Sequence, residues 1–347
     1  MLKTNRAIII WLYTGCFLVF AMVVVGGITR LTGSGLSITE WNVITGSIPP
    51  MSEQHWQEEF LKYQQSPQFK HINSSFQLHD FKAIYWWEYL HRLIGRLMGI
   101  IFIVPFLYFL AKKQISKSLL PKLIFIFILG AWQGFLGWYM VKSGLVNQPY
   151  VSHIRLAIHL MNALITFGYI FWVTLDLKRE HTLERNFASP AIKQLSIFTF
   201  IVLNIQIIYG AFVAGLKAGL IYNTWPKMGN EWISTTVHNA VHQHGWLSLV
   251  EDRPTIQFIH RTVAILVLIL VYYIWSNRHK HKWVLNDRQK QATSYAMVFL
   301  SIQVLLGIFT LLYHVPIWLG VVHQAGAFFI FAAMLYQIHC LVKTTKK

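Results

Sequence analysis

Eight long apolar stretches are the feature that most limits what this chain can fold into. They lie near residues 7–27, 89–110, 120–141, 154–175, 193–215, 256–276, 292–313 and 317–340. An α-helix needs about 20 apolar residues to cross the hydrocarbon core of a bilayer, and each stretch approaches that length. Only 12% of the residues are charged, whereas a soluble domain carries about 25%. The sequence therefore predicts an all-α integral membrane protein with eight transmembrane helices.

The net charge of +17 follows the topology of the chain and does not indicate nucleic-acid binding. Five segments, at the two chain ends and after the second, fourth and sixth stretches, hold 18 of the 30 Lys and Arg residues and 4 of the 13 acidic residues. Basic residues flank the cytoplasmic ends of membrane helices. We therefore expect both termini to be cytoplasmic, with membrane lipid around the spans and no nucleic-acid partner.

The two halves of the chain look like copies of each other. The matched positions are Gly35 with Gly219, Trp41 with Trp225, Gln133 with Gln303, Gly137 with Gly307, His91–Arg92 with His260–Arg261, and His159 with His323. Each copy has four spans, so both copies share one orientation in the membrane. The sequence predicts two tandem four-helix bundles, residues 1–176 and 177–347, an architecture that holds cofactors between facing helices.

Four histidines lie near the expected outer ends of four spans: His91, His159, His260 and His323. An ionisable side chain within a membrane helix is costly and usually marks a functional site. Imidazole is also a common axial ligand of heme iron. The pattern predicts two heme sites, one in each half. For any one histidine, a hydrogen bond to a neighbouring helix is the alternative.

Three arginines, Arg92, Arg155 and Arg261, lie beside these histidines or one turn away. Arginine pairs well with carboxylates, so we predict that these side chains bind heme propionates. Arginines at helix ends also extend into the lipid headgroups, and this alternative has equal weight.

The halves differ at one position near a histidine. Glu88 precedes His91 by three residues, whereas the second half has Gln257 before His260. Residues i and i+3 share a helix face, so Glu88 is expected to point toward the same pocket as His91. A carboxylate there can accept a proton, and the alternative is a glutamate that hydrogen-bonds to loop backbone. The asymmetry favours chemistry in the first half and an electron-transfer heme in the second.

Two segments between spans are longer than turns. In the first, about 28–88, aromatic residues recur at helical spacing within 52–65, which predicts a short helix on the membrane surface. The second, about 216–255, shows no clear periodicity. It carries His238, His242 and His244, a conceivable copper or zinc site that no acid or cysteine supports at useful spacing.

Several motifs resemble those of the heme A synthase family, in the branch shared by proteobacteria and mitochondria, and together they extend over nearly the whole chain. The motifs are Gly26–Thr32 with Ser34–Ser37, Trp86–Arg92, Met140–Leu145, Arg155–Leu160, Tyr222–Pro226 and Gln257–Arg261. Two departures stand out. The first long loop has no cysteine pair, and Asn147 stands where relatives often have an acid.

The resemblance implies an oxidoreductase that converts the C8 methyl group of heme O to a formyl group, giving heme A for terminal oxidase assembly. It implies that His91, His159 and Glu88 belong to the substrate heme site, and that His260 and His323 ligate a bound heme b. The resemblance also implies that the protein lies in a bacterial inner membrane, with the heme sites toward its outer side. The expected partners are heme O, handed over by the farnesyltransferase that forms it, and an unidentified electron-transfer protein. The oligomeric state, a homo-oligomer included, stays open.

Two other classes compete with this interpretation. A di-heme b-type membrane cytochrome that exchanges electrons with quinol fits the composition and the paired histidines equally well. A transporter also fits a four-plus-four repeat, but the spans lack helix-breaking Gly or Pro pairs at matching mid-membrane positions.

Overall fold

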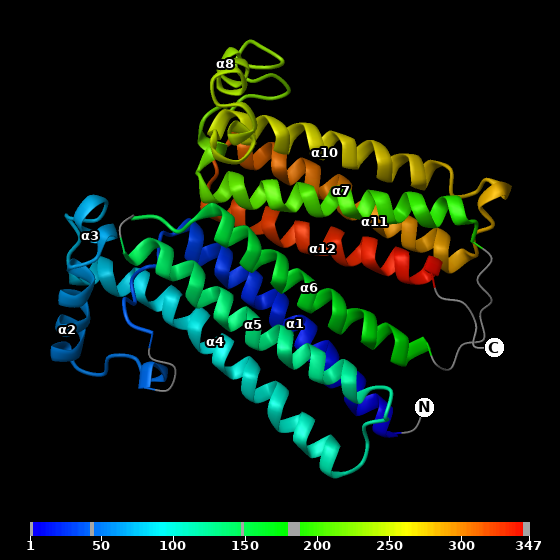
Figure 1. Ribbon diagram of the computed structural model, residues 1–347, viewed down its shortest axis with the longest axis horizontal. Coiled ribbons are helices and arrows are strands. Elements are labelled where there is room, and N and C mark those ends of the chain that lie inside the picture. Colours follow the sequence, from blue (N-terminus) through cyan, green and yellow to red (C-terminus); the bar gives the residue numbers. More distant parts are fainter. Residues whose placement is uncertain (1–2, 42–44, 147–148, 180–187, 343–347) are drawn as a thin grey trace. The chain divides into compact units, whose positions relative to one another are not determined.

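The computed structural model describes residues 3–41, 45–146, 149–179 and 188–342, and these parts of the chain are largely helical (Figure 1). Within them, eight helices are long and apolar enough to cross a membrane. They are α1 (Lys3–Leu31), α4 (Leu78–Ala111), α5 (Leu120–Leu145), α6 (His153–Arg179), α7 (Pro190–Gly215), α10 (Arg253–Ser276), α11 (Asp287–Leu312) and α12 (Ile317–Val342). No strand occurs among the described residues, so the predicted all-α membrane protein with eight spans is confirmed.

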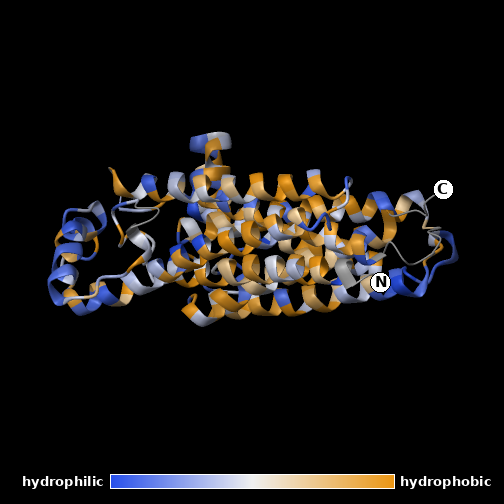
Figure 2. Ribbon diagram, turned by 90° about the horizontal axis from the view of Figure 1, so that it is seen from below, coloured by the Kyte–Doolittle hydropathy of each residue, from blue (hydrophilic) through white to orange (hydrophobic). Residues whose placement is uncertain are grey.

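The surfaces of these helices suit contact with lipid. Figure 2 shows hydrophobic residues along the long helices and hydrophilic residues gathered toward their ends. Large apolar side chains point outward from the spans, including Ile100 (57% exposed), Val104 (60%) and Leu305 (54%). Water would penalise so much exposed apolar surface, whereas a lipid environment removes that penalty.

Helix α4 is longer than the sequence predicted, because it begins at Leu78 rather than near residue 89. Its first turn is fixed by the backbone N–H of Gln77, which donates to the Asp80 carboxylate at 3.0 Å. The added turns bury Phe81 and Tyr85 against a short helix of the first long loop. Aromatic packing, and not an apolar run, therefore extends this helix beyond the predicted span.

That short helix, α2 (Glu53–Gln64), confirms the helix predicted within residues 52–65. Ser52 caps it by accepting a hydrogen bond from the backbone N–H of His55 at 3.2 Å. Trp56 and Tyr63 are buried against α4. The helices η1 (Thr45–Ser47) and α3 (Pro67–His71) complete this segment. Its position on a membrane surface stays a prediction.

The second long segment is more ordered than its lack of periodicity suggested. It contains η2 (Ala218–Leu220), α8 (Thr235–His244), η3 (Gly245–Leu247) and α9 (Ser248–Glu251). Helix α8 is short, with the hydroxyl of Ser234 accepting from the N–H of Thr236 at its start, and it buries only Val237 and Ala240. Two buried residues are too few to give a readable helical pattern. A further turn, η4 (His281–Trp283), precedes α11.

The chain divides into two compact units, Leu2–Ile170 (the first unit) and Phe171–Lys347 (the second unit). In the second unit, α7 and α11 each pack against both α10 and α12, which places α10 and α12 at opposite corners of a four-helix bundle. In the first unit, α4 packs against α1 and α5. The predicted tandem repeat and its boundary after residue 176 stay predictions.

Candidate functional site

In the first unit, both predicted histidines pack against glycines of neighbouring helices. A Cβ atom at Gly26 of α1 would lie 3.2 Å from Nε2 of His91, and one at Gly137 of α5 would lie 3.2 Å from Cε1 of His159. Contacts this short leave little room for any larger residue at either glycine.

The second unit repeats this arrangement. A Cβ at Gly210 of α7 would lie 3.2 Å from Cε1 of His260, and one at Gly307 of α11 would lie 2.8 Å from Cε1 of His323. Because His260 and His323 come from opposite corners of the bundle, they can approach a ligand from its two sides.

All four histidines are half-buried rather than sealed in the core. Nδ1 of His159 and Nδ1 of His323 are buried without a hydrogen-bond partner. A buried ring nitrogen that makes no hydrogen bond destabilises the folded state unless a ligand binds it. The paired imidazoles, their glycine backing and their unsatisfied nitrogens fit a heme held between two axial histidines.

Two glutamines contact the imidazole rings, and a third binds the backbone beside one. The amide Nε2 of Gln133 lies 3.3 Å from Nε2 of His159, whereas Nε2 of Gln303 donates to the backbone carbonyl of His323 at 2.9 Å. In addition, Gln206 Nε2 lies 3.1 Å from Nδ1 of His260. Such partners fix the orientation of a ligating ring. Sequence reasoning missed Gln206, although it lies one turn before Gly210 on the same helix.

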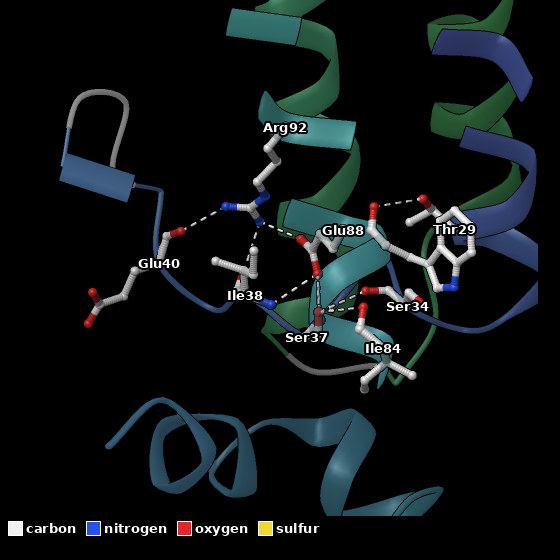
Figure 3. Close-up of polar contacts among 9 residues, drawn as sticks. Thr29, Ser34, Ser37, Ile38, Glu40, Ile84, Glu88 and Arg92 are labelled. Atoms are coloured by element: carbon white, nitrogen blue, oxygen red, sulfur yellow. Dashed lines mark hydrogen bonds and ion pairs between the residues drawn. The ribbon is translucent and has the colours of Figure 1, made fainter. Parts of the chain in front are cut away.

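Glu88 lies near the end of α4 that faces the first long loop, and its carboxylate is fully hydrogen-bonded (Figure 3). Oε2 accepts from the backbone N–H of Ser37 at 2.7 Å, from the Ser37 hydroxyl at 2.7 Å and from the N–H of Ile38 at 2.9 Å. Oε1 accepts from the guanidinium of Arg92 at 2.6 Å. The side chain of Glu88 is only 4% exposed. These contacts correspond to the loop-bonded alternative left open by the sequence.

Arg92 closes the same network. Besides Glu88, it donates to the carbonyls of Ile38 at 2.8 Å and Glu40 at 2.9 Å, and its guanidinium stacks 4.8 Å from the ring centroid of Trp41. Four partners hold this guanidinium in one orientation. Together, Glu88 and Arg92 fasten the loop that follows α1 onto α4.

The second unit has an equivalent contact between a helix and a loop, but donor and acceptor are exchanged. Gln257 Nε2 donates to the carbonyl of Tyr222 at 3.0 Å. Arg261 donates to three loop carbonyls, of Thr224, Pro226 and Lys227, at 2.8–3.0 Å. Its guanidinium stacks 5.2 Å from the Trp225 ring, as Arg92 stacks on Trp41. The first loop thus presents N–H groups to a carboxylate, and the second presents a carbonyl to an amide.

Arg155 is held differently. Its guanidinium donates to the carbonyl of Tyr139 at 2.8 Å and lies 3.8 Å from the Tyr139 ring centroid. All three predicted arginines therefore bind backbone carbonyls and stack on aromatic rings. Their predicted contact with heme propionates stays a prediction, and Arg92, which already has a carboxylate partner, is the least available of them.

The remaining candidates contribute little to either site. His238, His242 and His244 lie exposed on or at the end of α8, and among the described residues no group of three His, Cys, Asp or Glu is placed to hold a metal ion. Asn147 lies outside the described residues. Ser37 was missed by sequence reasoning, because nothing local to it signals that it binds a residue of α4.

The chain is similar in sequence to several known proteins. A family model described as "Cytochrome oxidase assembly protein" (COX15-CtaA) matches residues 9–335. The heme A synthase of Flavobacterium johnsoniae is 47% identical over 348 residues, covering 99% of this chain and 100% of the relative. The heme A synthase of Parvibaculum lavamentivorans is 44% identical over 339 residues, covering 98% of this chain and 95% of the relative.

Proposed function

Because this chain belongs to the COX15-CtaA family of cytochrome oxidase assembly proteins, we propose that it is a heme A synthase. The proposed reaction oxidises the C8 methyl group of heme O to a formyl group and gives heme A for terminal oxidase assembly. Near-full-length relatives with the same name support the proposal. They give no support to a di-heme cytochrome that only exchanges electrons.

We assign the substrate, heme O, to the first unit and a resident heme b to the second. The observation that carries the assignment is the presence in each unit of two half-buried imidazoles, each backed by a glycine of a neighbouring helix. His91 and His159 would hold the substrate, and His260 and His323 would hold heme b. Heme b bound between two histidines supplies one-electron transfer.

The residues around the substrate pair act mainly by positioning. Glu88 neutralises Arg92 and anchors the N–H groups of Ser37 and Ile38, so it holds the loop that follows α1 against α4. A group preorganised in this way costs little reorganisation during a reaction. Oε2 already accepts three hydrogen bonds, so a direct proton-accepting role for Glu88 must act through Oε1, beside the Arg92 guanidinium. We therefore propose Glu88 as a positioning residue, with proton transfer as the less favoured role.

The setting we propose is a bacterial inner membrane with both termini in the cytoplasm and the heme sites toward the outer side. The concentration of Lys and Arg in the chain ends and in alternate loops supports this orientation. Heme O would come from the farnesyltransferase that forms it, and electrons would pass to a separate redox protein.

The proposal is tested by coexpressing the full chain with a supply of heme O and identifying the extracted pigments by chromatography. We expect heme A together with heme b. His91→Ala should give heme b without heme A. Pigment consisting of heme b alone from the wild-type protein, with heme O available, would instead identify a b-type cytochrome.

A further inference from the structure

The first unit contains a cavity of about 370 Å³ between α4, α5 and the loop that follows α1. Its walls include the rings of Trp41 and Trp138 and the cationic groups of Arg92 and Lys142. Arg92 directly follows His91, and Trp138 directly follows Gly137, the residue against which the His159 ring packs. The cavity therefore lies between α4, which carries His91, and α5, whose Gly137 backs His159, toward the loop end of these helices.

Most of the charges around this cavity are already neutralised. The Arg92 guanidinium is paired with Glu88 at 2.6 Å. The Glu40 carboxylate lies 3.3 Å from the ammonium of Lys62. In contrast, the Lys142 ammonium lies over the Trp138 ring, 5.0 Å from its centroid, and has no carboxylate partner among the described residues. Lys142 is thus the positive charge that this cavity offers to a ligand.

The second unit places its available positive charge elsewhere. Lys142 follows Gly137 by five residues, and the residue that follows Gly307 by five is Leu312. The corresponding cavity, about 240 Å³, is lined by Trp225, Phe258 and Arg261 among others, and by no lysine. Because Gln257 replaces the glutamate, Arg261 hydrogen-bonds to carbonyls there, and no carboxylate among the described residues pairs with its charge. The two cavities therefore offer a cation from different helices.

From this difference we propose that Lys142 binds a propionate carboxylate of the substrate heme and fixes its rotation between His91 and His159. The inference rests on the proposed function. On a straight helix, Lys142 lies about 7.5 Å beyond Gly137 along the axis, toward the loop end. An ammonium forms a strong, charge-assisted hydrogen bond to a carboxylate. Flat aromatic walls suit the edge of a planar macrocycle.

Rotation matters because two axial imidazoles alone do not define it. A heme held only through its iron can turn about the axis that joins the two histidines, which brings different methyl groups to the same wall. The propionates occupy one edge of the ring. A cation at a fixed place beside that edge therefore selects which methyl group is presented for oxidation. Lys142 is a positioning residue in this role.

The test is a binding titration of the full-length protein carrying its heme b. Heme O and heme O dimethyl ester, which lacks the propionate charge, are titrated separately into the wild type, Lys142→Gln and Lys142→Arg. Lys227→Gln serves as a matched control, since the Lys227 ammonium lies 5.8 Å from the Trp232 ring centroid in the second unit. Retained heme b content reports that each variant is folded.

We expect Lys142→Gln to weaken heme O binding about five-fold, the size of a partly screened ion pair, and to leave the dimethyl ester unaffected. Lys142→Arg and Lys227→Gln should behave as the wild type does. Equal weakening of both ligands, or no change in either, overturns the role of Lys142 while heme O binding itself stands. If the wild type takes up no more heme O than His91→Ala does, the proposed function fails together with the inference.

Discussion

Replacement of Glu88 by glutamine should weaken the contacts that hold the loop after α1 against α4. The carboxylate faces four donors: the N–H groups of Ser37 and Ile38, the Ser37 hydroxyl and Arg92. A glutamine amide presents an NH₂ group to some of them and carries no charge. The two side chains of the ion pair are only 4% and 10% exposed, so solvent screens the pair weakly. Removing one partner of a buried pair costs about 3–5 kcal/mol. Arg92 keeps its two carbonyl acceptors, and we expect a loss near 3 kcal/mol.

Hydrogen exchange measured by mass spectrometry in detergent or nanodiscs is the direct assay. Glu88→Gln replaces one of the two acceptor oxygens with an NH₂ group and removes the charge that binds Arg92, so the loop with the Ser37 and Ile38 N–H groups should open more often. A loss of about 3 kcal/mol corresponds to roughly hundred-fold faster exchange at these amides. The α12 amides of the second unit provide the internal reference. The affinity of the first unit for heme O should fall as well, because Arg92 and the loop move together.

A double-mutant cycle with Arg92→Gln separates the ion pair from the loop contacts. Contacting residues of this kind give coupling energies of about 0.5–3 kcal/mol. Unchanged exchange at Ser37 and Ile38, together with normal heme O affinity and lost heme A formation, would refute the positioning role. That result would return Glu88 to the proton-accepting role suggested by the sequence.

Two further variants test the heme b site. Gly307→Ala places a methyl group 2.8 Å from Cε1 of His323 and should cost about 1–3 kcal/mol of overpacking, with loss of the low-spin heme b spectrum. Gly130→Ala, which has nothing within 4 Å of the added carbon, should be silent. Gln206→Leu removes the amide 3.1 Å from Nδ1 of His260 and should weaken heme b retention about 10–100-fold, as outer-shell partners of metal ligands do. Met22 precedes Gly26 by four residues, as Gln206 precedes Gly210, and the control variant Met22→Leu should retain heme b normally.

The spans could be predicted from sequence because length and apolarity suffice to identify a membrane helix. The start of α4 could not be predicted in the same way. Its first turns carry Phe81 and Tyr85 among polar residues, and they are helical because those rings pack on α2. That contact joins residues far apart in the chain, so a span predicted from the length of an apolar run does not include it.

The candidate site shows the same limit at Glu88. The i and i+3 relation to His91, and the i and i+4 relation to Arg92, could be read from the sequence. The two N–H groups that meet the carboxylate belong to Ser37 and Ile38, about fifty residues earlier, and only the fold brings them there. Long-range backbone contacts of this kind decide whether a buried carboxylate stabilises a loop or takes part in a reaction.

The central claim, that each unit holds its own heme between its own two histidines, is tested most directly by low-temperature electron paramagnetic resonance. The full-length protein is compared with His91→Ala and His260→Ala, each after loading with heme O. We expect the wild type to show two low-spin ferric heme signals. His91→Ala should lose only the signal that appears on loading, and His260→Ala only the signal of the resident heme b. Loss of both signals in either variant, or persistence of both in each, would contradict the account.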